Sequence, residues 1–559
     1  MPRSNRCRRR CSGICRWRTR ANGPRLRRCC APCRRSAAPT ATSSARRWAW
    51  CGNGAASCAA ARRIPTIAAV GRWRAGRRWW ASGWPEGGAV AGTFDILGIG
   101  WSALSSHRLA GEVIGHNMAN AATPGYSRQR ADLLARDPWL GRPGPIGTGV
   151  DVPGISQARD LFIERSLLGA NAGQGYQSQR VQVLTTLESA FGVGADDPIE
   201  RSLSDFFSAL RDLAANPGGA AERVALLSAG RSLGDSFRLQ RTRLEEARAA
   251  LDGQVAGMVG DIQSRLDQIA ELNREIRIQE SAGGSANDLK DRRMQLANEV
   301  AERIGVVTVA DDRGNLNLAL ADGTMLVNAD RVARLSAEAQ AANDGLLSPV
   351  VLAPDGSRRV LDESVSGRLG GLLAARDGEA RRALERLDEI AFGLAQAFNA
   401  QHRAGFGLDG IGGRDFFAPI AAADGAAGQL RLDAAVDGQP DALAAAQDAL
   451  GLPGDNRNAQ ALADLQSALL FAGGTRAASE YWRAAVTDLG AGLEGAERAL
   501  DQAAARLSMV SQMREAVSGV SLDEEMIELA KAQRAFEAAA KVIQAGDEML
   551  EIILSLKKD

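Results

Sequence analysis

The last helix of the chain decides the fold, because its pattern is the most regular in the sequence. Residues 521–554 read SLDEEMIELAKAQRAFEAAAKVIQAGDEMLEIIL. Ser521 with Glu524 three residues later forms a capping box at the start. Ten positions spaced by three and four follow, and eight are apolar: Leu522, Met526, Leu529, Gln533, Phe536, Ala540, Ile543, Asp547, Leu550 and Leu554. The spacing predicts an amphipathic helix whose apolar stripe is too narrow to be stable alone.

A second amphipathic helix is predicted from Phe94 to about Ala122. Its apolar residues also recur at spacings of three and four, and Pro124-Gly125 ends it. The segment from there to about Ile155 is rich in Pro and Gly, which indicates an extended loop or hairpin. We expect the first and last helices to pack on each other, or on neighbouring copies.

The middle of the chain is predicted to be mainly helical with a smaller β-rich part. A helix beginning after Asp197-Pro198 and a long one over 221–280 carry the clearest helical patterns. Glycine lowers the stability of a helix interior, so we expect a bend or break at Gly253, Gly257 and Gly260. After residue 304 the apolar period changes from 3.6 to 2, which is typical of strands.

These patterns predict a mainly α fold with a smaller β-rich part: two amphipathic terminal helices, a long helical-bundle domain and an inserted β-rich domain. The expected order is a leader over 1–90, the first terminal helix and its loop over 91–155, the helical bundle over 156–303, the β-rich domain over 304–370, a helix over 371–403, an irregular or β insert over 404–455, returning bundle helices over 456–515 and the last terminal helix over 516–559.

The leader differs in composition from the rest of the chain. Residues 1–85 hold 21 Arg and no Lys, Asp or Glu, whereas the chain from Glu86 onward has 47 basic and 66 acidic residues, a net charge of −19. The leader also holds all eight cysteines and seven of the ten tryptophans. With almost no Ile, Leu or Val, such a stretch cannot build a core.

Three interpretations of the leader were weighed. Cys7, Cys11 and Cys15 could bind zinc, but no paired CxxC motif or nearby His supports it. A basic nucleic-acid-binding arm is the second interpretation. The composition favours the third, translation of GC-rich DNA upstream of a true start near Val90 or Ala91. N-terminal sequencing of the native protein tests this hypothesis.

The remaining chain lacks the usual signs of an enzyme. It has no Cys, only His107, His116 and His402, and none of the common catalytic or nucleotide-binding motifs. We interpret His116 as a packed or hydrogen-bonded helix histidine, and paired acids such as Glu524-Glu525 as helix starts. We therefore expect no catalytic residues, no cofactor and no metal, and the charge of −19 disfavours nucleic acid.

Export by the general secretory route is not indicated. The sequence has no 18-residue apolar run, and no positively charged region leads into an apolar segment with a cleavage site. We expect no membrane-spanning segment. A protein of this kind that leaves the cell needs another export route.

Two terminal segments resemble the axial proteins of the bacterial flagellum, the family of rod, hook and hook-associated subunits. Residues 115–129, GHNMANAATPGYSRQ, are similar to the family's ANxxTPGYSRQ motif. Residues 518–526, 533–536, 540–543 and 547–550 are similar to its C-terminal helix, apart from Phe536 where Tyr is usual. The resemblance assigns subunit packing to Asn117, Ala119, Asn120, Thr123, Pro124, Gly125, Tyr126 and Ser127 and, on the last helix, to Leu522, Met526, Leu529, Phe536, Ala540, Ile543 and Leu550.

The middle of the chain resembles the hook-associated branch of that family. The similar segments are LESAFG (187–192), LSDFFSAL (203–210), ANP (215–217), IAELN (269–273) and ANDLKDRR (286–293). The resemblance implies terminal helices that form a coiled coil and a β-rich domain on the outside. It also implies a structural adaptor between hook and filament, exported through the flagellar type III apparatus and assembled in a ring. Its implied partners are copies of itself, hook subunits, a second junction protein or filament subunits, and a cytoplasmic export chaperone. A hook or distal-rod subunit is the alternative within the family, and a secreted enzyme on a flagellar scaffold the alternative outside it.

Overall fold

The computed structural model describes residues 93–141, 144–192, 197–311 and 314–556. All of these belong to one unit, residues 88–559, in which the elements contact one another. The leader predicted over 1–90 lies outside the described residues.

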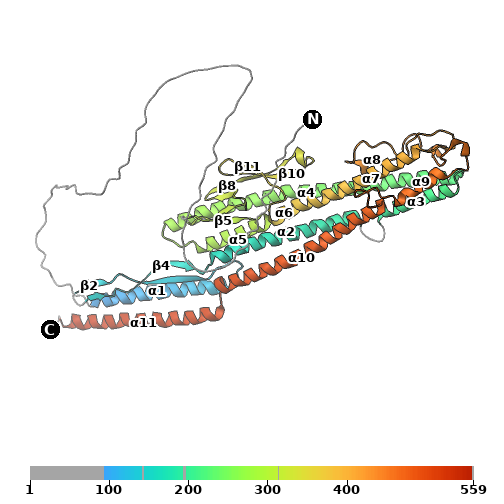
Figure 1. Cartoon of the computed structure of the whole chain (residues 1–559). Helices are drawn as coiled ribbons and strands as arrows, with labels where there is room; N and C mark the ends of the chain where they lie inside the picture. The colour runs from blue at the N-terminus through green and yellow to red at the C-terminus, as the bar shows by residue number, and fades with distance from the viewer. Residues whose placement is uncertain (1–92, 142–143, 193–196, 312–313, 557–559) are drawn as a thin grey trace, which may run out of the picture. The chain divides into compact units, whose positions relative to one another are not determined.

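The terminal helices are α1 (Thr93–Ala119) and α11 (Leu522–Ser555), and they pack along each other (Figure 1). The side chain of Ser521 accepts a hydrogen bond from the Glu524 N–H at 3.5 Å, so the predicted N-cap forms. The Glu524 carboxylate binds Arg128. The prediction that the two terminal helices pack on each other is confirmed within one chain.

A long β-hairpin lies along α1. Its strands β1 (Gln129–Ala135) and β4 (Val150–Gln157) pair antiparallel, and both contact α1. The short strands β2 (Trp139–Gly141) and β3 (Gly144–Ile146) pair at its tip. The hairpin keeps its pairing up to Gln157, so the next helix begins at Leu161 and not near residue 156 as its pattern had indicated.

The helical body consists of α2 (Leu161–Phe191), α3 (Pro198–Ala215), α4 (Ala220–Ser281), α5 (Asn287–Arg303) and α10 (Ala478–Ser518). Asp197 caps α3 by accepting hydrogen bonds from two backbone N–H groups, with Pro198 in the first turn, as predicted. Phe191 of α2 stacks on Trp482 of α10, and the Trp482 indole donates to Asp197 at 2.6 Å. This contact joins three helices at one point.

The expected break in the long helix is absent, and that prediction was wrong. Helix α4 runs without interruption for 62 residues. Gly253, Gly257 and Gly260 all lie on its exposed face, while the opposite face buries a continuous apolar row. The packing energy of that row exceeds the propensity cost of the three glycines.

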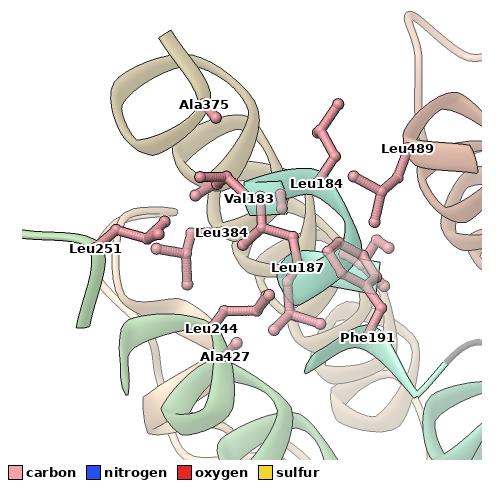
Figure 2. Close-up of a cluster of buried hydrophobic side chains, with 14 of the residues drawn as sticks. Val183, Leu184, Leu187, Phe191, Leu244, Leu251, Ala375, Leu384, Ala427 and Leu489 are labelled. Carbon is pink, nitrogen blue, oxygen red and sulfur yellow. The ribbon is translucent and has the colours of Figure 1, made fainter. Parts of the chain in front are cut away.

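The main core forms where α2 meets α4, α7 (Ala380–Arg403) and α10. Figure 2 shows side chains from these helices pointing into one cluster. They include Val183, Leu184, Leu187, Phe191, Leu244, Leu251, Leu384 and Leu489. This cluster packs the N-terminal half of α10 against the rest of the body.

Strands occur where the apolar period changes to two. One sheet has the order β5-β6-β7-β8 and another the order β11-β10-β9, all antiparallel. The bounds are β5 Val307–Val309, β6 Asn317–Ala319, β7 Met325–Asn328, β8 Arg331–Val332, β9 Arg334–Ala339, β10 Leu347–Leu352 and β11 Arg358–Val360. Arg376 ties β10 to α4, because its buried guanidinium donates to the Leu347 carbonyl at 2.7 Å and to Asp252 at 2.6 Å.

The helix predicted over 371–403 starts earlier and is not uniform. It comprises α6 (Gly367–Leu373), a π-helical stretch (Ala374–Glu379) and α7. Residues 404–455 are irregular as expected, but the strand signals at Leu430, Leu432 and Val436 yield only an isolated bridge between Phe417 and Leu432. Short helices in this part are α8 (Ala426–Gln429) and 3₁₀ turns at 440–442 and 449–451. They are followed by α9 (Arg457–Asp464) and a 3₁₀ turn at 465–467, and another 3₁₀ turn at 341–343 lies between β9 and β10.

Candidate assembly site at the base of the terminal helices

The seam between α1 and α11 is built on small residues that let the two backbones approach. Glu525, Ala532, Ala539 and Gly546 are buried at intervals of seven along α11. A methyl group on Gly546 would lie 2.9 Å from Leu97, and one on Gly100 would lie 2.7 Å from Ile543. These reciprocal contacts show that each helix places a large side chain over a glycine of the other. The seven-residue repeat is that of a coiled coil.

The contact between α1 and α11 buries only part of the predicted apolar stripe. Leu529, Ala540, Ile543 and Leu550 are partly buried, and Phe536 is 37% exposed. Leu522 and Met526 remain largely exposed. The pattern of apolar residues on α11 is therefore wider than one partner helix covers.

The TPGY segment after α1 is a type II turn. The Tyr126 N–H donates to the Thr123 carbonyl at 3.2 Å, with Pro124 in the second position of the turn. Gly125 has φ +81°, the value that this turn requires and that residues with a side chain rarely adopt. Asn120 supports the turn, since its side chain accepts a hydrogen bond from the Thr123 hydroxyl at 3.1 Å. The turn sends the chain back along α1 as the hairpin.

Asn117 uses all four hydrogen-bonding positions of its side-chain amide. It donates to the Gln129 carbonyl and to Glu525, each at 2.9 Å. It accepts from the Tyr126 hydroxyl at 2.8 Å and from the Gln129 N–H at 2.9 Å. With only 1% of its surface exposed, Asn117 fixes the turn, the first strand and the start of α11 relative to one another.

Arg128 neutralises the carboxylates at the start of α11. Its guanidinium lies 2.6 Å from buried Glu525 and 2.7 Å from Glu524, and its backbone N–H donates to the Ser518 carbonyl at 2.9 Å. Burial raises the pKa of Tyr126 above its ordinary value, and nearby carboxylates, Glu525 among them, raise the pKa further. The tyrosine hydroxyl therefore stays protonated and remains a donor to Asn117.

Arg514 connects the end of α10 to the turn. It donates to the Gly125 carbonyl at 2.8 Å and to the Ser127 hydroxyl at 3.3 Å, and its guanidinium lies 3.6 Å from buried Glu164 of α2. The Ser127 N–H donates to Asp291 of α5 at 3.1 Å. We call Asn117, Tyr126, Arg128, Arg514 and Glu525 the corner cluster.

The structure gathers most of the predicted motif residues at this corner. Asn117 and Ser127 are buried in it, whereas Ala119, Thr123 and Pro124 are exposed on its surface. His116 is an exposed helix histidine, 3.4 Å from Asp288 and edge-on to the ring of Tyr126. An open groove of about 700 Å³ runs between the turn and the 514–521 segment.

Sequence inspection missed Arg514 and the pairing of Arg128 with Glu525. Both arginines form ion pairs with buried carboxylates from segments far apart in the sequence. No local sequence pattern reveals such pairs. In the part of the chain that the structure describes, no group of His, Cys, Asp or Glu is arranged to hold a metal ion. No helix among the described residues is long and apolar enough to cross a membrane.

Two family models match the chain. Residues 184–417, which hold most of the helical body and the β-rich part, match the helical domain of the flagellar hook-associated protein FlgK. Residues 512–556, which hold the end of α10 and all of α11, match the C-terminal model of the flagellar basal body rod FlgEFG proteins.

Full-length relatives agree with this match. Flagellar hook-associated protein 1 of Bacillus subtilis is 28% identical over 506 residues, covering 83% of this chain and 99% of the relative. The protein of the same name from Salmonella typhimurium is 25% identical over 553 residues, covering 83% of this chain and 100% of the relative. These matches, together with the terminal motifs, support hook-associated protein 1 as the family of the chain.

A solved structure has the same fold. It is described as the flagellar hook junction protein FlgK from Burkholderia pseudomallei, with a TM-score of 0.55 and 17% identity. The alignment covers 64% of this chain and all of the solved chain. The family resemblance inferred from the terminal motifs is thus confirmed, and the corner cluster lies where the family's N-terminal motif meets its C-terminal helix.

Proposed function

We propose that the chain is a structural subunit of the bacterial flagellum that joins the hook to the filament at their junction. The observation that carries this proposal is the paired α1 and α11, held at a fixed angle to a helical body by the corner cluster. A fixed angle lets identical copies repeat one arrangement, because each copy presents its terminal helices in the same direction.

Self-association is supported by apolar surface on α11 that α1 does not cover. Large apolar side chains flank the seam on both sides and are exposed, among them Met526, Ile527, Val542 and Met549. A row of this length on one helix marks an interaction surface. We propose that the predicted packing residues Leu522 and Met526 act here, between copies and not within one.

The proposed location outside the cell requires export. We propose that the chain passes through the flagellar type III apparatus, as the family resemblance implies, and that a cytoplasmic chaperone holds α11 beforehand. Residues 93–556 contain no Cys, so no disulfide within this part has to form or break on the way. The narrow stripes of both terminal helices allow them to order only when they pair and assemble.

Hook subunits on one side and a second junction protein or filament subunits on the other are the proposed partners. The names of the relatives place those proteins at the hook. A hook or distal-rod subunit is the less well supported alternative, because residues 184–417 match the helical domain of the hook-associated protein FlgK. We propose no catalytic activity, because the buried polar groups of the site bond one another and the site residues are tied into the fold.

Deletion of the gene tests the proposal. Cells should then keep hooks of normal length, lose filaments and release filament subunits into the medium, as seen by electron microscopy and immunoblotting. Absent hooks would favour a rod or hook subunit. Normal filaments would contradict a junction role.

A further inference from the structure

The C-terminal end of α11 extends past the described part of α1. Leu97 lies against Gly546 and Gly100 against Ile543, so the two helices run antiparallel and Thr93 falls opposite a residue near Leu550. Residues 551–556 then run beyond the described part of α1. Four large apolar side chains in this overhang are between 49% and 73% exposed: Ile552, Ile553, Leu554 and Leu556.

A second uncovered apolar surface lies at the end of α10. Met509, Met513 and Val517 follow one another at intervals of four and form one stripe along the helix. Their side chains are between 43% and 57% exposed. The adjacent face of α10 is occupied, because Val510 is buried against α2 and Arg514 is bound in the corner cluster.

The two surfaces lie at opposite ends of α11. Helix α10 ends beside the turn that follows α1, where Arg514 donates to the Gly125 carbonyl at 2.8 Å (Figure 1). Helix α11 begins only after this point, at Leu522, and does not cover the stripe. At ~1.5 Å per residue, the overhang at Leu554 lies ~48 Å from that start. One copy therefore cannot bring its own overhang onto its own stripe.

We propose that the overhang of one copy, residues 551–556, docks on the Met509–Met513–Val517 stripe of a second copy. The proposal rests on the self-association proposed above and names the residues of one contact. Both surfaces span about two helical turns and both are apolar. The overhang continues the heptad positions of the α1–α11 seam, with Leu550 and Ile553 in register, so it is shaped to pack on another helix.

The stripe is suited to receive such an end. Unbranched methionine side chains adapt to the shape of a partner, and Met509 and Met513 supply two of the three side chains. Because different surfaces of the two copies meet, the contact is heterologous and can continue from copy to copy around a ring or helix. Each copy carries both the overhang and the stripe, so each copy can contact one neighbour through the overhang and another through the stripe.

Disulfide cross-linking in assembled flagella tests the contact. The chain is expressed with the eight leader cysteines changed to Ser, and Leu554→Cys is combined with Met513→Cys. The matched control combines Leu554→Cys with Ser508→Cys, which lies on the same helix but about 140° away from Met513. A disulfide requires the two Cα atoms to lie within about 7 Å.

After mild oxidation, the first variant should give a ladder of multimers on a non-reducing gel, and the control should give at least tenfold less. Filaments without a ladder would overturn the contact but leave the junction role intact. An equal ladder from the control, or a cross-link to another flagellar subunit, would also overturn it.

A charge exchange tests the contact without a cross-link. Leu554→Glu or Met513→Lys alone should lower the amount of chain found in isolated hooks by about tenfold, and the two together should recover most of it. Normal incorporation of the single variants, or no recovery in the double variant, would contradict the proposal. Loss of export is recognised separately, because the chain then accumulates in the cytoplasm.

Discussion

The Asn117 amide on the first helix donates a hydrogen bond to the Glu525 carboxylate on the last helix, 2.9 Å away and 408 positions later in the sequence. Both side chains are 1% exposed. Each end of the chain therefore completes the hydrogen bonding of the other. Arg514 holds the turn beside them, so a polar cluster links the terminal helices to the body.

Asn117→Ala should release α11 from the corner. The change removes a donor from buried Glu525 and leaves the Tyr126 hydroxyl and the Gln129 N–H without their acceptor. Leaving buried polar groups unpaired costs ~2–4 kcal/mol in total. Hydrogen exchange of the α11 amides should accelerate accordingly.

Asn120→Ala is the matched control for this change. Asn120 lies three residues later, and its bonds are local and exposed. Its loss should cost less than ~1 kcal/mol. Equal acceleration in both variants would show that Asn117 has no special role.

Gly100→Ala should open the seam of the terminal helices. A methyl group there would lie 2.7 Å from the Ile543 side chain, closer than packed atoms tolerate. Gly98→Ala, two residues earlier, meets nothing within 4 Å and should stabilise α1 by up to ~1 kcal/mol through helix propensity. The urea concentration at the midpoint of unfolding should fall for Gly100→Ala and rise for Gly98→Ala. A shift in the same direction for both variants would contradict the packing of α1 on α11.

The same logic applies to the long helix of the body. Gly257→Ala adds a methyl group in open space on α4 and should raise stability by up to ~1 kcal/mol. Gly234→Ala on the same helix would place a methyl group 2.5 Å from the Leu430 carbonyl oxygen and should lower the stability. Thermal unfolding distinguishes the two, and a stabilised Gly234 variant would show that residues 430–432 are not fixed against α4.

Local sequence patterns predicted the elements whose signals are local. The cap at Asp197 with Pro198, the end of the first helix before Pro124-Gly125 and the change of period after residue 304 each depend on neighbouring residues. The pairing of the terminal helices also followed, because both stripes were too narrow to be stable alone.

The partners of these elements could not be predicted, since they depend on long-range packing. The face of α11 that meets α1 centres on the small residues Ala532, Ala539 and Gly546, with Ile543 of the predicted stripe beside them. The continuity of α4 depends on a buried row that offsets its glycines. The corner cluster joins residues hundreds of positions apart, so the role of Arg514 becomes visible only in the fold.

His402 should make the irregular segment after α7 sensitive to acid. Its ring is 1% exposed and has both nitrogens bonded: Nδ1–H donates to the Arg414 carbonyl at 2.8 Å, and Nε2 accepts from the Ala444 N–H at 3.0 Å. A protonated ring could not accept from Ala444. Burial lowers the pKa of His402 below its ordinary value, although the Arg414 carbonyl and Asp415 act in the opposite direction.

The sign of the pH dependence follows from that lowered pKa. Below about pH 6.5 the unfolded state binds a proton that the folded state does not, so stability falls as pH decreases toward the lowered pKa and then levels off. The slope is at most ~1.4 kcal/mol per pH unit. His402→Gln should flatten the dependence of hydrogen exchange at residues 440–446 between pH 5 and 7, whereas His107→Gln on α1 should not. An unchanged slope in the His402 variant would mean that another group controls this segment.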